Sequence, residues 1–119
     1  MEWRLDKDRP ICPQIGEQLA AGIANGEFAA NEKLLSVREV ALLAGVNPNT
    51  VQKAYQELER DGIIFSRAGA GWYVSEDTDK AVRRVEELAR TRTEAYVSGM
   101  QVLGKTREQM IRMIEEVTV

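Results

Sequence analysis

The sequence predicts a mainly α-helical fold that carries one small β-hairpin. Apolar residues recur every three or four positions in several segments, as they do on the buried face of a helix. Two of these segments meet at Gly45, which predicts two helices joined by a tight turn. Further along, two short runs rich in β-branched and aromatic residues are separated by glycines, which predicts the hairpin.

The first predicted helix follows a short lead. Its apolar stripe has a spacing of four: Ile11, Ile15, Leu19 and Ile23. Asn25 and Gly26 come next and are typical of a helix end. Residues 1–9 are compatible with a short strand that has its apolar side chains on one side, and residues 27–35 are expected to form a connection without regular structure.

The second and third helices have clear end signals. Ser36 and Glu39 form a capping box, so a helix is expected to start there and to end at Gly45. Asn47 is a strong N-cap, and Pro48 fits the first position of the next helix, where no backbone donor is needed. The apolar stripe of this third helix is expected to face the core: Val51, Ala54, Tyr55 and Leu58.

The hairpin separates two parts of different character. Two strands are predicted around an "AGAG" loop, whose glycines can adopt the positive φ angles of a hairpin turn. After the hairpin the chain becomes charged and amphipathic, and Thr106 and Gln109 form a capping box that opens a last helix. We therefore expect a domain over residues 1–75 and a two-helix segment over residues 76–119.

The composition excludes most kinds of catalytic chemistry. The 119 residues include no histidine and a single cysteine, which removes His-dependent nucleophile triads, His-containing zinc sites and thiolate clusters. No nucleotide-binding loop is present. The carboxylates lie beside Lys and Arg on charge-mixed helix faces, where a solvated surface is the simpler interpretation. We expect no enzymatic activity, no metal and no cofactor.

The location and the charge are less informative. No run is long enough to span a bilayer, and the N-terminus lacks the pattern of a secretory signal. With a lone cysteine and hence no internal disulfide, these features predict a cytoplasmic protein without membrane contact. The net charge of −3 is unusual for a protein that binds nucleic acid. Such binding, however, depends on a local patch rather than on the total charge.

The start of the third helix is polar for a helix that packs on a core. Asn49, Thr50 and Lys53 lie opposite its apolar stripe, so they are expected to face outward. A helix presented in this way by a helix-turn-helix enters the major groove of DNA by its N-terminal end. A simpler role remains open for each residue. Asn47 could serve only as a cap, and Arg38 could pair with a neighbouring carboxylate.

The order of motifs carries a resemblance to a known family. Ser-x-Arg-Glu-hydrophobic-Ala, Gly-Val-Asn-x-x-Thr-Val, Ala-Tyr-x-x-Leu-Glu, Gly-Ile-Ile and Arg-x-Gly-x-Gly follow one another. This segment resembles the winged helix of the GntR family of bacterial transcription regulators, and the two-helix tail resembles that of its YtrA-type subfamily. The resemblance implies a winged helix-turn-helix DNA-binding domain, followed by a C-terminal two-helix dimerisation segment. It also implies a homodimeric repressor on a palindromic operator of double-stranded DNA.

The resemblance also assigns DNA contacts to residues of this chain. They come from the starts of the second and third helices and from the wing: Ser36, Arg38, Asn47, Asn49, Thr50, Gln52, Lys53, Arg67 and Gly69. By analogy with the subfamily, the regulated genes could form a transporter operon.

Several positions depart from the family pattern. Leu35 replaces a usual proline, so the entry to the second helix is less rigid. Asn31 stands where glycine is common, and asparagine tolerates left-handed geometry. Cys12 replaces a usual tyrosine, and Trp72 a usual threonine. Pro48 stands where other subfamilies carry arginine, which removes one potential contact to phosphate or guanine and implies a different base preference.

The tail carries more apolar residues than two lone helices can bury on each other. They are Val82, Val85, Leu88, Ala89, Tyr96, Met110, Ile111, Met113 and Ile114. Symmetric pairing of two copies would cover them, and a small effector could bind at that interface. The acidic net charge supports one alternative to DNA binding, a winged helix that serves only as a protein-interaction module.

Overall fold

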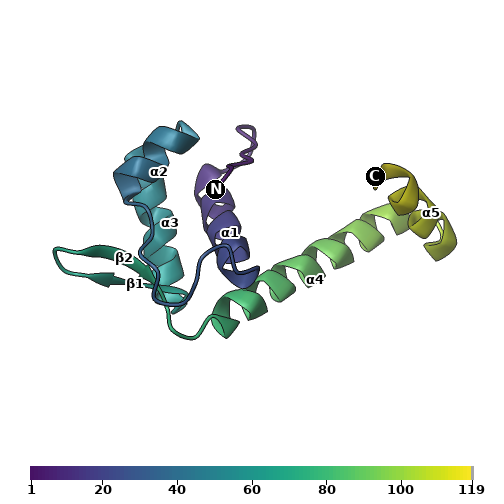
Figure 1. Cartoon of the computed structure of the whole chain (residues 1–119). Helices are drawn as coiled ribbons and strands as arrows, with labels where there is room; N and C mark the ends of the chain where they lie inside the picture. Colours follow the sequence, from purple (N-terminus) through teal and green to yellow (C-terminus); the bar gives the residue numbers. More distant parts are fainter. Residues whose placement is uncertain (119) are drawn as a thin grey trace. The chain divides into compact units, whose positions relative to one another are not determined.

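A computed structural model describes residues 1–118 and confirms the predicted fold class. Five helices and one two-stranded antiparallel hairpin follow one another within these residues (Figure 1). Their bounds are α1 Ile11–Ala24, α2 Val37–Ala44, α3 Pro48–Arg60, β1 Ile64–Arg67, β2 Gly71–Val74, α4 Asp79–Val102 and α5 Arg107–Val117. The chain divides into two structural units, Met1–Val85 and a second unit that begins at Glu86.

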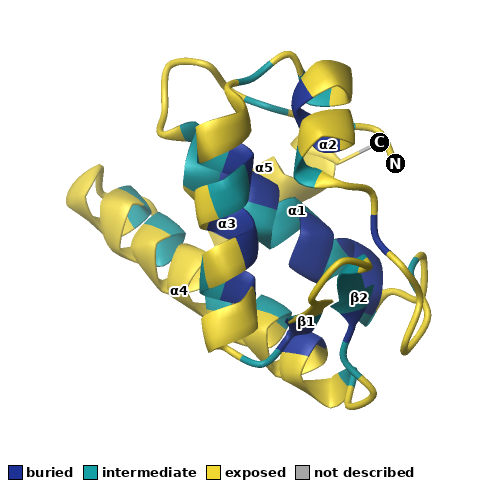
Figure 2. Cartoon of the chain, turned by 90° about the vertical axis from the view of Figure 1, so that its left-hand side faces the viewer, coloured by how far each residue is buried: buried dark blue, intermediate teal, exposed yellow. Residues whose placement is uncertain are grey.

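The first unit holds the hydrophobic core. Helix α3 packs against both α1 and α2, and Figure 2 shows buried residues along α1 and α3. The largest fully buried side chains come from these three helices and from the hairpin: Ile15, Val40, Val51, Tyr55, Ile64 and Val74. The first turns of α4 belong to the same unit, where Ala81 is buried and Val85 packs against the core.

The predicted helix ends of the helix-turn-helix are confirmed. The Ser36 hydroxyl accepts a hydrogen bond from the Glu39 amide at 3.1 Å, and the Glu39 carboxylate accepts one from the Ser36 amide at 3.0 Å. Helix α2 ends at Gly45, which has a φ of +69°. An L residue with a side chain rarely adopts this angle, so glycine is what allows the tight turn into α3.

The connection between α1 and α2 is more ordered than the sequence predicted. The amides of Asn31 and Leu34 donate to carbonyls of β2 at 2.9 and 2.8 Å, and Lys33 pairs with Tyr73 as an isolated antiparallel bridge. Strand β2 is therefore bonded on one side to β1 and on the other to this connection. Asn31 has a φ of +65°, as expected for an asparagine at a glycine-like position.

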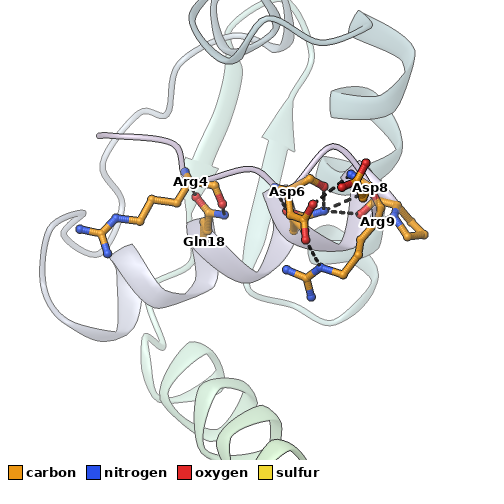
Figure 3. A network of polar contacts seen from close by, with 7 residues as sticks. Arg4, Asp6, Asp8, Arg9 and Gln18 are labelled. Carbon is orange, nitrogen blue, oxygen red and sulfur yellow. Dashed lines mark hydrogen bonds and ion pairs between the residues drawn. The ribbon is translucent and has the colours of Figure 1, made fainter. Parts of the chain in front are cut away.

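The lead before α1 forms no strand, contrary to expectation. Two glutamines of α1 take up its backbone hydrogen bonds instead. Gln18 accepts from the Arg4 amide at 2.9 Å and donates to the Arg4 carbonyl at 2.8 Å (Figure 3). Gln14 is buried and makes the same pair of bonds to Asp6, at 2.7 and 2.8 Å. Side-chain amides thus replace the partner strand that the sequence pattern suggested.

The second unit consists of the remainder of α4 and of α5. Gly104, with a φ of +79°, lies between the two helices. The predicted capping box at the start of α5 is confirmed, because Thr106 and Gln109 bond each other's amides. Met110 is the only buried apolar side chain of this unit within the described residues. No helix of residues 1–118 has both the length and the apolar character needed to cross a membrane.

Candidate nucleic-acid interface

The N-terminal end of α3 is capped by the side chain of Asn47 and lies at the surface. The Asn47 side-chain oxygen accepts from the Asn49 amide at 2.8 Å, and Pro48 occupies the first turn. The predicted capping role of Asn47 is confirmed. The bond uses the side-chain oxygen, which leaves the side-chain amide of Asn47 as a donor at the surface. The exposed helix start also carries the positive end of the helix dipole, which favours phosphate nearby.

The polar residues of the first two turns of α3 lie on the surface. Asn49 and Lys53 are exposed, and Thr50 and Gln52 are half-buried. The apolar residues of α3 face the opposite way, and all are buried: Val51, Ala54, Tyr55 and Leu58. The predicted division of α3 into a core face and a polar face is confirmed. The polar face has the side-chain donors and acceptors that base edges and phosphates require.

Tyr55 anchors α3 to the elements on both sides of it. Its hydroxyl donates to the Leu35 carbonyl at 2.7 Å, just before α2. Its ring meets Trp72 of β2 edge-on, with the centroids 5.3 Å apart. Burial raises the pKa of the Tyr55 hydroxyl, which therefore stays protonated and keeps donating. Tyr55 packs in the core, as predicted, and together with Trp72 it fixes α3 relative to α2 and the hairpin.

The start of α2 adds a second polar end. The Ser36 oxygen accepts one hydrogen bond in the capping box, and its O–H remains a donor toward a further group. Hydrogen bonds from Ser36 lower the pKa of the Glu39 carboxyl, which keeps the box charged. Arg38 is exposed, and within residues 1–118 no ion pair ties it to a carboxylate. Its guanidinium is therefore available to an external anion.

The hairpin supplies the third set of residues to the candidate interface, after the starts of α3 and α2. It extends away from α1, on the other side of α3 (Figure 1). Gly69 lies in its loop with a φ of +75°, and no atom occupies the space beside it. Arg67 ends β1, is exposed, and lies over the rings of Phe65 and Tyr73. The loop can thus bring backbone close to a partner, with a cation beside it.

The acidic residues of α3 lie at its other end. Glu59 accepts from the amide and the hydroxyl of Ser66 in β1, at 3.1 and 2.7 Å. Glu57 and Asp61 also lie in the last turns. The negative net charge is therefore compatible with a modestly basic start of α3, because the acids of this helix gather away from that start.

Two lysines near these elements were not singled out by the sequence analysis. Lys33 pairs with β2, and Lys7 donates to the Gly45 carbonyl at 3.1 Å in the turn of the helix-turn-helix. Both contacts join residues far apart in the chain, so no local pattern marks them. The Lys7 bond stabilises the C-terminal end of α2, where cations are favoured.

Cys12 is half-buried beside the core, with its sulfur 3.8 Å from a Glu57 carboxylate oxygen. Burial and then the charge of Glu57 raise the pKa of the thiol. A raised pKa lowers the thiolate fraction and with it the reactivity toward oxidants. A packing role for Cys12 follows. Within residues 1–118, no group of acidic, His or Cys side chains could hold a metal ion.

The comparisons with known proteins agree with this arrangement. The model of the bacterial regulatory proteins of the gntR family matches residues 13–74, which contain the helix-turn-helix and the hairpin. The chain belongs to the GntR family. The match covers more than half of the chain and contains every residue to which the sequence analysis assigned a DNA contact.

Relatives in this family are similar over nearly the whole chain. The uncharacterized HTH-type regulator YhcF of Bacillus subtilis is 36% identical over 99% of this chain and 98% of its own length. The HTH-type repressor YtrA of the same organism is 36% identical over 92% of this chain and 85% of its own length. A GntR family regulator from Listeria monocytogenes has a similar structure, with a TM-score of 0.83 and 38% identity over 95% of this chain and 99% of its own.

This GntR protein is a DNA-binding transcription regulator and not an enzyme. It is of the YtrA type, in agreement with the sequence-based resemblance. The fold of its first unit is the winged helix-turn-helix, in which α3 is the second helix of the motif and the hairpin is the wing.

Proposed function

We propose that this protein is a homodimeric repressor that binds a palindromic operator in the cytoplasm. One observation carries the proposal: the first two turns of α3 present polar side chains to solvent while the apolar face of the helix is anchored in the core. A recognition helix needs this arrangement, because it must expose its contact residues without losing its own position. The similarity to the repressor YtrA supports repression.

The proposed DNA contacts divide into two kinds. Asn49, Thr50, Gln52 and Lys53 would read base edges in the major groove, because they lie on the outward face of α3. The amide of Asn47 would act beside them. The remaining residues would bind the phosphate backbone or the minor groove: Ser36, Arg38, Arg67 and Gly69.

The proposed division of labour follows the chain. Residues 1–75 would bind DNA, and residues 76–119 would form the dimer. The support for the dimer is the apolar surface of α5, where Ile111, Ile114 and Val117 are 46%, 51% and 80% exposed. A second copy could cover this surface in a symmetric interface. A palindromic operator is the DNA counterpart of such symmetry.

Binding to the DNA upstream of its own gene tests the proposal. Thr50→Ala and Lys53→Ala should each weaken binding to that duplex by about 1–3 kcal/mol for each half-site in which a base contact is lost. Arg60→Ala serves as the control, because Arg60 is an exposed cation at the opposite end of the same helix. If all three variants bind the upstream duplex and a scrambled duplex like the wild type, α3 is not the reading element.

A further inference from the structure

One face of the wing carries a cluster around Arg67, and the proposed contacts leave the other residues of this cluster without a role. In the antiparallel register Phe65 pairs with Tyr73, and Arg67 pairs with Gly71. Directly opposed residues of a sheet have their side chains on the same face, as do residues two apart on one strand. Ile64 and Val74, which are buried, therefore lie on the core face. Phe65, Tyr73 and Arg67 lie on the outer face.

The aromatic pair on this outer face fixes the arginine. The rings of Phe65 and Tyr73 stack with their centroids 5.6 Å apart and an interplanar angle of 22°. The guanidinium carbon of Arg67 lies 5.4 Å from the centroid of Phe65 and 5.0 Å from that of Tyr73. A guanidinium on aromatic faces keeps its charge and loses much of its rotamer freedom. Arg67 is thus held in place before any partner binds.

Lys33 reaches the same face from the neighbouring segment. It pairs with Tyr73 on the edge of β2 that faces away from β1, so its side chain lies on the outer face as well. Its Cε lies 3.3 Å from the position that a Cβ of Gly71 would occupy. The lysine therefore passes over the glycine opposite Arg67, and a larger residue at position 71 would displace it.

Both cations lack an acidic partner at contact distance. Within residues 1–118, no ion pair of 4.0 Å or less joins Lys33 or Arg67 to a carboxylate. Two cations on one face without a carboxylate partner favour an anion there. The pKa of Glu39 is lowered mainly by the bonds from Ser36, and the charge of Lys33 lowers it less than these bonds do.

We propose that Lys33 and Arg67 clamp the DNA phosphate backbone beside the groove that receives the wing, with Phe65 and Tyr73 as positioning residues for Arg67. The proposal rests on the proposed DNA binding by α3 and the wing, and it adds Lys33 and the aromatic pair to the contacts. Arg67 supplies a planar fork for one phosphate, and Lys33 supplies a point charge for the same or the next phosphate. The clamp is independent of base sequence.

Salt titrations of two variants test the clamp. Lys33→Met and Arg67→Met keep much of the side-chain length and remove the charge. Dissociation constants are measured between 50 and 200 mM salt, for the upstream duplex and for a scrambled duplex of equal composition. Each variant should lower the salt slope of the dimer complex by about 1.8 on both duplexes, which is about 0.9 for each subunit. Its deficit relative to the wild type should therefore shrink by about 12-fold across this range. Arg60→Met, which removes a cation at the far end of α3, should leave the slope unchanged.

A double-mutant cycle tests the positioning role of the aromatic pair. Phe65→Leu keeps the apolar bulk but removes a ring from beneath Arg67. It should weaken binding in the wild-type background and have no further effect in the Arg67→Met background. Equal losses in the two backgrounds would mean that Phe65 acts only through the stability of the wing, and would overturn this role. Thermal unfolding of each variant, measured without DNA, separates a loss of fold from a loss of contact.

The two proposals can fail separately. Unchanged slopes for Lys33→Met and Arg67→Met would overturn the clamp, even if Lys53→Ala abolishes the preference for the upstream duplex. A wild type without such a preference would contradict the proposed operator recognition. In that case, the change in salt slope that Lys33→Met and Arg67→Met cause on the scrambled duplex would still show whether the clamp binds phosphate.

Discussion

The two structural units of this chain differ in how completely they bury their own apolar residues. The first unit has a continuous core of fifteen buried residues, from Ile15 in α1 to Ala81 at the start of α4. The second unit buries Met110 alone within the described residues and leaves the other large apolar side chains of α5 exposed. Each helix of the second unit is well formed, so its local sequence signals are sufficient. What the unit lacks is a core of its own.

The difference shows that helix formation and burial are separate requirements. The capping box of α5 matches that of α2 in kind, with a hydroxyl and a side-chain oxygen that bond each other's backbone amides. Helix α2 packs on the core of the first unit. Helix α5 also has an apolar stripe, but its own unit is too small to bury it. Our interpretation is that the first unit is stable by itself, while the second becomes stable by association.

The largest expected effect follows from Ile114→Glu in α5. A charge placed in the proposed dimer interface without a partner costs about 3–5 kcal/mol, and symmetry places it there twice. The dissociation constant of the dimer should rise at least about a hundredfold, and sedimentation at micromolar concentration should show a monomer.

Arg112→Glu is the matched control for this substitution. Arg112 is exposed on the opposite side of α5, nearly half a turn from Ile114, so the same new charge should leave association unchanged. An Ile114→Glu protein that sediments like the wild type would refute the assignment of α5 to the interface.

Ile15→Ala tests whether the first unit is stable through its own core. Ile15 is fully buried between the helices of the first unit, so its truncation should cost about 2–5 kcal/mol of unfolding free energy. Urea denaturation in the Ile114→Glu background measures this loss without a contribution from association. Ile15→Val should cost only about 0.5–1.5 kcal/mol. A loss that depends on protein concentration would show that the first unit also relies on a partner.

Tyr55→Phe should have a smaller effect on the same unit. It removes the hydroxyl that donates to the Leu35 carbonyl at 2.7 Å while the ring keeps its contact with Trp72. The bond joins a hydroxyl to a neutral backbone carbonyl and is only part-buried, so the cost should be about 0.5–1.5 kcal/mol. Equilibrium unfolding in urea gives the value, and a loss above the range for core truncations would mean that the hydroxyl also fixes the start of α2.

The smallest effect concerns Cys12. Because burial and Glu57 raise the pKa of its thiol, the thiolate fraction at neutral pH lies below that of an ordinary cysteine. Alkylation by iodoacetamide should be slower in the folded protein than in urea, and its rate should rise only as the pH approaches the raised pKa. Glu57→Gln should shift this rise to lower pH. Faster alkylation of the folded protein at neutral pH would contradict the packing role.

Sequence reasoning was most successful where the signal is local. The caps of α2, α3 and α5 each depend on residues within three positions of one another, and all three form as predicted. The outward face of α3 followed from helical periodicity alone. These features require no knowledge of the tertiary structure, because nearby backbone groups satisfy them.

Sequence reasoning failed where distant residues meet. Residues 1–9 have the alternation of a strand but bond to Gln14 and Gln18, whose amides stand in for a second strand. Lys33 lies in a segment with no periodicity, and only its pairing with Tyr73 brings it to the wing. No local pattern encodes either contact, so Arg67 was predictable from the sequence as a DNA contact but Lys33 was not.

The central claim is that two winged helices, joined through their tails, bind one operator together. Sedimentation of the protein with the upstream duplex tests this claim most directly through the mass of the complex. We predict two chains per duplex for the wild type, and for Ile114→Glu a much weaker binding that still depends on Lys53. A saturated complex with one chain per duplex, or Ile114→Glu binding as tightly as the wild type, would contradict the account.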